Sequence, residues 1–250
     1  MTDFETLDQA RNALDFFWHH SLAIGWGPPT DPRRAQVSGS CDSIGYLQVW
    51  TSSWNRFAAK SRGSLSPSQQ KGALLLEATR DYLEVLHNVP PNTSIQDHMV
   101  FDVRLPLFQS MVDRLEKIVE TDSSSGPTFS PEIGLVPQLF VVAHRCRDPV
   151  VRRKALHLLL TCGRREGLWD SNAAARIAGR IIELEEEGLG PIYCNSDIPA
   201  HARVVSIVLD FRTDLLATIR YGRLKAGDGS SRDFVETIQL VDWPCHAFWE

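Results

Sequence analysis

Histidines near carboxylates are the first residues of this 250-residue sequence that could carry chemistry. His98 and Asp102 stand at positions i and i+4, which share one face of a helix and suit a general acid–base pair. His144 comes just before Arg145 and Arg147, the start of a group of arginines. If the chain is an enzyme, its catalytic candidates are His98, Asp102, His144 and Arg147. A histidine–aspartate pair at this spacing is more often a surface or capping contact, so we expect no catalytic residue.

A cluster of basic residues is the second chemical feature. Seven lysines and arginines lie between Arg145 and Arg165, and Asp148 is the only acid among them. One interpretation is a site for an anionic ligand, because the free amides of the helix after Asp148 attract negative charge. The residues that would contact such a ligand or a partner are Arg145, Arg152, Arg153, Arg165 and Trp169.

The favoured interpretation of the same cluster is structural. Arginine pairs well with carboxylates and with the carbonyl groups at the carboxyl ends of helices. In that case the dipeptides Arg147-Asp148, Arg165-Glu166 and Trp169-Asp170 fasten corners between helices. The acids available as partners are Glu166, Asp170, Glu183, Glu185, Glu186 and Glu187.

The sequence contains no residue set typical of a metal or cofactor site. His19 and His20 are adjacent, so on a helix they point about 100° apart and do not chelate together. The five cysteines are odd in number and widely separated, which is typical of reduced thiols rather than of a disulfide framework. The sequence has no HExxH motif, nucleophile elbow or phosphate-binding loop. We therefore expect no metal and no cofactor.

Composition and charge favour a folded protein that does not bind DNA directly. Hydrophobic residues make up 43% of the chain and charged residues 23%, which is typical of globular proteins. The formal net charge is −5, whereas a surface that binds duplex DNA is usually basic. The first residues are acidic, and no apolar stretch is long enough to span a membrane. We expect a chain that is neither secreted nor inserted in a membrane.

Apolar residues recur at helical spacing over most of the chain. This pattern predicts an N-terminal helix over residues 1–24 and a helical core over residues 41–190. Residues 25–40 are rich in Pro, Gly and Ser, which predicts a flexible linker. Within the core, Ser66 to Gln69 form a capping box at the start of one helix. A long helix is expected from about Ser94 to Thr121, with a kink at Pro106.

Helix caps and strand signals mark the second half of the chain. Asp148-Pro149 and Asp170-Ser171 predict the starts of two helices, and Gly188 the end of the second. Residues 191–250 change character and predict an antiparallel β meander followed by an aromatic tail. The predicted strands cover residues 203–211, 215–224 and 234–241. The predicted fold is therefore mainly α, a single domain over residues 1–250 of stacked antiparallel helix pairs with a small C-terminal antiparallel β meander.

The segment from Phe129 to Gly188 contains four distinctive patterns. They read F-S-x-E-x-G-x-x-P-x-L, C-R-D-P-x-x-R-R-x-A, R-R-E-G-x-W-D-S and E-E-x-G, and they begin at Phe129, Cys146, Arg164 and Glu185. With these patterns the segment resembles the fungal-specific transcription factor domain, which lies C-terminal to the binuclear zinc cluster of fungal regulators. Residues 7–11 and 198–203 extend the resemblance over most of the chain.

The resemblance implies a transcriptional regulator-like protein that acts through contacts with a protein partner or a small-molecule effector. It implies a location in the nucleus, with the cytoplasm as the alternative, and a link to a fungal biosynthetic gene set. The family binds DNA through six closely spaced cysteines that hold zinc, and this chain contains no C-x-x-C pair. We therefore expect no direct sequence-specific DNA binding.

Several alternatives follow from that departure. The chain is a truncated regulator, a partner of another regulator, a repurposed domain, or a gene-model fragment whose zinc cluster lies in an upstream exon. A homodimer is compatible with each of them. The rival hypothesis is a small-molecule-binding protein or an enzyme of secondary metabolism, built on the same helical domain with a pocket between its helices.

Overall fold

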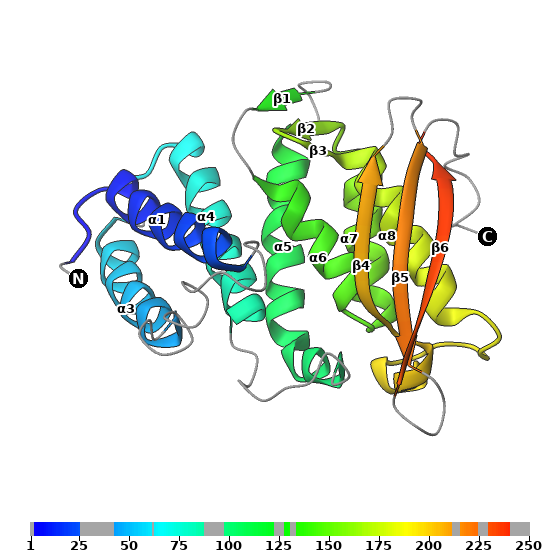
Figure 1. Ribbon diagram of the computed structural model, residues 1–250. Coiled ribbons are helices and arrows are strands. Elements are labelled where there is room, and N and C mark those ends of the chain that lie inside the picture. The colour runs from blue at the N-terminus through cyan, green and yellow to red at the C-terminus, as the bar shows by residue number, and fades with distance from the viewer. Residues whose placement is uncertain are drawn as a thin grey trace. The chain divides into compact units, whose positions relative to one another are not determined.

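The fold is described from a computed structural model of the chain (Figure 1). By its internal contacts the chain divides into two compact units, residues 1–89 and 90–250. The predicted fold class is confirmed, since the chain is mainly helical and ends in a small antiparallel sheet. The prediction of one domain stays a prediction, and the aromatic tail and nearly all of the predicted linker lie outside the described residues. The structure describes residues 3–25, 43–61, 63–87, 98–122, 128–130, 134–211, 216–224 and 230–240.

The first unit is built from helices α1 (Leu7–Gly25), α3 (Ser43–Ser61) and α4 (Pro67–His87). Its core is aromatic: the rings of Trp50 and Trp54 stack with centroids 5.4 Å apart. The indole N–H of Trp50 donates to the carbonyl of Ala10 at 2.9 Å, so the buried polar tip is satisfied. The predicted capping box is confirmed by reciprocal hydrogen bonds between Ser66 and Gln69 at the start of α4.

The second unit begins with a 3₁₀ segment, η1 (His98–Arg104), and helix α5 (Leu105–Asp122). The prediction of one long helix kinked at Pro106 is therefore wrong. Pro106 is the second residue of α5, where a proline is tolerated because the first amides of a helix have no partner within it. The proline starts this helix instead of bending it.

Three helices form the core of the second unit: α6 (Leu135–Arg145), α7 (Pro149–Thr161) and α8 (Ser171–Glu186). Helix α6 packs against both α7 and α8, and its residues 135–144 are all buried. A helix that is enclosed in this way needs apolar residues all around, which its sequence supplies. Helix α8 ends as predicted, because Gly188 adopts a φ of 73° that favours glycine.

A small sheet lies at one end of these helices (Figure 1). It consists of β1 (Thr128–Ser130), β2 (Arg164–Glu166) and β3 (Trp169–Asp170), with β1 parallel to β2 and β2 antiparallel to β3. The interpretation of residues 164–171 as a simple corner between helices missed this hairpin. Its turn contains Gly167, whose φ of 57° lies in the left-handed region.

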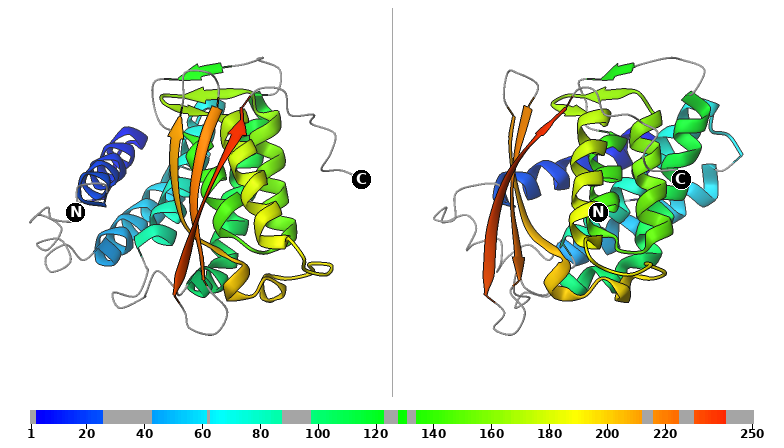
Figure 2. Two further views of the ribbon diagram at one scale, coloured as in Figure 1. Left: turned by 45° about the vertical axis from the view of Figure 1, so that its right-hand side comes forward. Right: turned by 90° about the vertical axis from the view of Figure 1, so that its right-hand side faces the viewer.

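The predicted meander is confirmed as β4 (Val204–Phe211), β5 (Leu216–Leu224) and β6 (Ser231–Gln239), paired antiparallel in that order. Two short 3₁₀ segments, η2 (Asn195–Asp197) and η3 (Ala200–Ala202), lead into it. Figure 2 shows the sheet as a layer beside α8. Arg180 on α8 holds it there, donating from Nε and Nη2 to the carboxylate of Glu236 on β6 at 2.9 and 3.1 Å.

Candidate functional site

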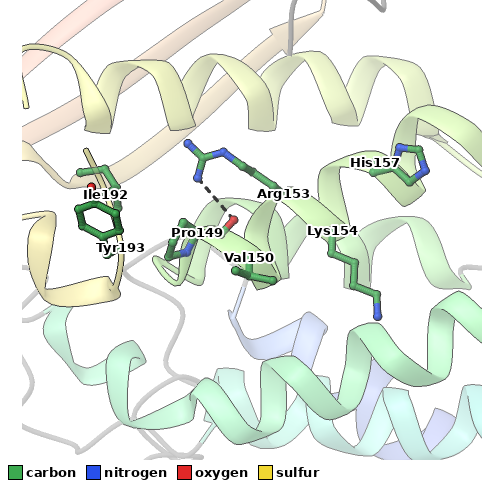
Figure 3. Close-up of a pocket in the computed structure, with 7 residues that line it drawn as sticks. All are labelled: Pro149, Val150, Arg153, Lys154, His157, Ile192 and Tyr193. Atoms are coloured by element: carbon green, nitrogen blue, oxygen red, sulfur yellow. Dashed lines mark hydrogen bonds between the residues drawn. The ribbon is translucent and has the colours of Figure 1, made fainter. Parts of the chain in front are cut away.

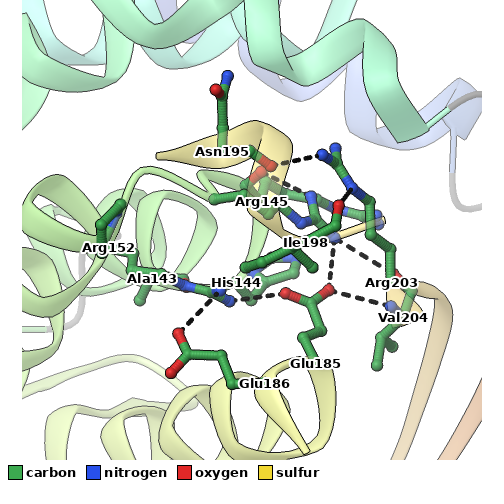
Figure 4. Close-up of polar contacts among 12 residues, drawn as sticks. Ala143, His144, Arg145, Arg152, Glu185, Glu186, Asn195, Ile198, Arg203 and Val204 are labelled. Atoms are coloured by element: carbon green, nitrogen blue, oxygen red, sulfur yellow. Dashed lines mark hydrogen bonds and ion pairs between the residues drawn. The ribbon is translucent and has the colours of Figure 1, made fainter. Parts of the chain in front are cut away.

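Three buried charged side chains meet where the helices adjoin the C-terminal sheet (Figure 4). Glu185 on α8 accepts hydrogen bonds from Arg147 at 2.7 Å and from Arg152 at 2.8 Å. The same carboxylate accepts the backbone N–H of Val204, the first residue of β4, at 3.0 Å. One side chain therefore links the turn after α6, helix α7, helix α8 and the sheet.

The arginines of this cluster also bind the carboxyl end of α6. Arg147 donates to the carbonyl of Arg145 at 2.6 Å, and Arg152 donates to the carbonyl of Ala143 at 3.4 Å. These contacts confirm, for Arg147 and Arg152, the prediction that the basic cluster pairs with the acids after it and with helix carboxyl ends. Arg153 follows the same pattern on the surface, where it donates to Glu186 at 2.5 Å.

The buried position determines the electrostatics of the cluster. Burial alone would raise the pKa of Glu185, because it removes the carboxylate from water. The guanidinium groups of Arg147 and Arg152 outweigh this effect and lower the pKa of Glu185 to about 2. Burial lowers the pKa of Arg152, but an arginine has such a high ordinary pKa that it stays charged. The cluster is therefore a fixed ionic triad near neutral pH.

A second buried arginine clamp lies beside the triad. Arg203, which is fully buried, donates from both terminal nitrogens to the carboxylate of Asp102 at 2.8 and 2.9 Å. It also donates to the carbonyls of Asn195 and Ile198, each at 2.9 Å. Arg203 therefore joins η1, the segment around η2 and the start of β4. The side chain of His98, the predicted partner of Asp102, lies outside the described residues.

His144 lies near the end of α6, and its side chain is buried in the core. Its Nδ1 lies 2.7 Å from the carbonyl of Phe140, and the two rings pack with centroids 4.5 Å apart. Burial, with the charge of Arg145, lowers the pKa of His144 well below its ordinary range. Arg145 itself lies with its guanidinium 5.3 Å from the ring centre of Phe101, and burial lowers the pKa of Arg145 to about 10.

Glu166 on β2 caps helix α6 from a distance. Its buried carboxylate accepts the backbone N–H groups of Gly134, Leu135 and Val136 at 3.0, 3.2 and 2.9 Å. These amides belong to the first turn of α6, where a negative charge is stabilised by the helix dipole. A Cβ on Gly134 would lie 2.7 Å from this carboxylate, so the close approach requires glycine. The hairpin is thereby fixed to the helical core.

Aspartates cap the two helices that flank this hairpin, as predicted. Asp148 accepts the amides of Val150 and Val151 at 3.1 and 3.0 Å at the start of α7. Asp170 accepts the amide of Ala173 at 2.9 Å at the start of α8. The ring of Trp169 packs on the ring of Phe140 with centroids 5.5 Å apart.

The residues proposed to contact a ligand or partner do not come together in one site. Arg145 and Arg152 belong to the interior around the triad, whereas Arg153 lies on the outer side of α7. Trp169 is half-buried against α6. Arg165 on β2 is exposed, and among the described residues its side chain makes no ion pair.

An open groove of about 630 Å³ runs along the outer side of α7 (Figure 3). Its basic side chains are already paired: Arg153 with Glu186, and Lys154 with Asp113 and Glu116 on α5. None of the catalytic candidates lines it. The lining residues are Pro149, Val150, Arg153, Lys154, His157, Ile192 and Tyr193.

Part of this chain is similar to a fungal transcription regulator. Over 85 residues it is 38% identical to the aspercryptin biosynthesis cluster-specific transcription regulator atnN of Emericella nidulans. The aligned stretch covers 32% of this chain and 14% of that regulator. No family model and no solved structure matches the chain. The similarity supports a relationship to fungal transcription regulators.

In the described part of the chain, no helix is both long enough and apolar enough to cross a lipid bilayer.

Sequence reasoning gave Glu185 and Glu166 only as two of six possible partners of the arginines, and it missed the role of Arg203. A signal for Glu185 was present, because it stands four residues after the buried Ile181 and therefore on the apolar face of α8. A charged residue at such a position is buried and needs a partner. For Glu166 the only indication was a missing local cap. Helix α6 begins after Gly134, which has no side chain that could cap it, so the cap has to come from elsewhere in the chain.

Proposed function

We propose that this chain is a regulatory region of transcription-regulator type that acts through contacts with a protein partner or a small-molecule effector. The observation that carries the proposal is the 38% identity over 85 residues with a cluster-specific transcription regulator. In this proposal the chain works in the nucleus and takes part in control of a fungal biosynthetic gene set.

The placement of the buried charged residues supports a structural role for them, in which they hold the fold of the regulatory region together. Arg147, Arg152 and Arg203 are buried and donate hydrogen bonds to Glu185, Asp102 and backbone carbonyls. These side chains hold helices and sheet together, and they are unavailable to a substrate. Regulatory work would then fall to the outer surface of the scaffold.

A tethering experiment tests the proposal. The full chain is fused to a heterologous DNA-binding domain whose operator precedes a reporter gene in a filamentous-fungal host. We expect reporter transcription to differ from that given by the DNA-binding domain alone, because a regulatory region acts wherever it is brought to a promoter.

Two matched variants distinguish an effect of the folded regulatory region on transcription from an effect of attaching any protein to the DNA-binding domain. Glu185→Gln removes the charge that the buried arginines need, so the fusion should lose its effect on transcription. Glu187→Gln changes an acid that is 71% exposed two residues further on and should leave the effect intact. A wild-type fusion that leaves transcription unchanged at normal protein level contradicts the proposal.

A further inference from the structure

Three exposed side chains belong to the small sheet β1–β2–β3 and to the turn between β2 and β3. Phe129 on β1 is directly paired with Arg165 on β2, so their side chains point to the same side of the sheet. Phe129 is 70% exposed, Arg165 is exposed, and Leu168 in the following turn is fully exposed. We name Phe129, Arg165 and Leu168 the hairpin surface. In Figures 1 and 2 no helix or strand of residues 90–250 lies over the end of the unit that carries it.

The backbone under the hairpin surface is held firmly. The carboxylate of Glu166 is fixed by the first amides of α6, and Trp169 packs on Phe140. Asp170 on the last strand of the hairpin caps α8. An exposed leucine on such an anchored turn is costly in water yet needs little ordering when it binds a partner.

We propose that the hairpin surface is a docking site for an acidic, apolar segment of a partner protein. The inference rests on the proposed function, since it names where the regulatory region would meet its partner. Exposed aromatic and arginine side chains are the types that supply most of the binding energy at protein interfaces. Here an exposed arginine is paired with an exposed phenylalanine, and an exposed leucine follows three residues later in the turn.

Charge complementarity selects the acidic character of the partner. Arg165 makes no ion pair within the described residues, whereas the neighbouring Arg164 is paired with Asp122 and Glu166. Asp170, which is paired with Arg165 across the hairpin, has its Oδ1 on the cap of α8 and forms no ion pair with Arg165. A partner carboxylate flanked by apolar residues would therefore satisfy the guanidinium while covering Phe129 and Leu168.

Fluorescence anisotropy with the full chain tests the proposal. The probe is a labelled synthetic peptide in which Asp alternates with Leu and Phe, and a matched peptide carries Lys in place of Asp. We expect saturable binding of the Asp peptide at physiological salt and none of the Lys peptide. Leu168→Ser and Phe129→Ser should each weaken binding at least about tenfold. Arg165→Glu should abolish binding of the Asp peptide and allow binding of the Lys peptide.

Val150→Ser is the control, because Val150 is 73% exposed on α7 and lies outside the hairpin surface. It should leave the affinity unchanged, and circular dichroism should show that every variant is folded. The proposal is overturned if the wild-type chain does not bind the Asp peptide, if both peptides bind equally, or if Val150→Ser weakens binding as much as Leu168→Ser.

The reporter fusion separates this inference from the proposed function. If the wild-type fusion alters transcription and the Phe129→Ser/Leu168→Ser fusion alters it equally, the docking surface is wrong and the regulatory function stands. If the wild-type fusion has no effect, the regulatory function fails whatever the peptide titrations give.

Discussion

Two guanidinium groups and one carboxylate meet in the interior of the 90–250 unit, where none of them contacts water. Glu185 carries the only negative charge that both Arg147 and Arg152 bind within 3 Å among the described residues. Glu185→Gln keeps the shape but leaves the buried Arg147 without its carboxylate and Arg152 with only Glu186, whose Oε1 lies 3.7 Å from Nη1 of Arg152. We expect a loss of about 3–5 kcal/mol in the free energy of unfolding, measured by urea denaturation.

The control for this substitution is Glu187→Gln, at the carboxyl end of the same helix, α8. Glu187→Gln removes a carboxylate that is 71% exposed, and exposed ion pairs contribute little to stability. Its unfolding midpoint should stay close to that of the wild-type chain. Equal losses in the two variants would show that the triad does not stabilise the fold.

The depressed pKa of Glu185 predicts how this difference depends on pH. Its pKa in the folded chain is about 2, below the ordinary value of 4.5. A depressed carboxyl pKa means that its stabilisation is fully present above pH 4.5 and is lost as the pH falls toward 2. The difference in unfolding free energy between wild type and Glu185→Gln should therefore be constant near neutrality and shrink between about pH 5 and pH 2. A difference that grows on acidification would refute the assignment.

At the scale of elements, the start of α6 depends on a strand that lies far along the chain. Gly134→Ala would place a Cβ 2.7 Å from the carboxylate of Glu166, which three amides hold in position. We expect a loss of about 1–3 kcal/mol in stability and faster hydrogen exchange at the amides of Leu135 and Val136. Gly190→Ala, where an added Cβ meets no atom within 4 Å, should change neither quantity.

The same elements show which features sequence can predict. The caps of α4, α7 and α8 were predictable, because Ser66, Asp148 and Asp170 bind amides only a few residues away. The cap of α6 was not, because Glu166 is 32 residues from Gly134 and no local rule identifies so distant an acceptor. The parallel pairing of β1 with β2 could not be predicted for the same reason, because the two strands are far apart in the sequence. Likewise Arg203 and Asp102 are 101 residues apart and were noticed only separately.

At the scale of the whole molecule, the basic residues that dominate the sequence between Arg145 and Arg165 do not make a basic surface. Arg147 and Arg152 are buried with Glu185, and Arg153, Lys154 and Arg164 are each paired with acids. The formal net charge of the chain is −5. The positive charge of this segment is therefore mostly neutralised inside the fold, and little of it is presented to a polyanion.

This distribution predicts that the purified chain does not retain DNA specifically at physiological salt. Phosphate neutralisation supplies most of the affinity of DNA-binding proteins, so binding to a random pool of duplexes should be weaker than about 1 µM. A triple variant replaces three exposed acids by lysine: Glu120→Lys, Glu187→Lys and Asp210→Lys. Each substitution raises the net charge by two, so the net charge changes from −5 to +1. That variant should gain binding that is weak, indifferent to sequence and abolished by salt. Electrophoretic shifts at two salt concentrations measure both proteins, and a nanomolar, sequence-selective shift by the wild-type chain would contradict the prediction.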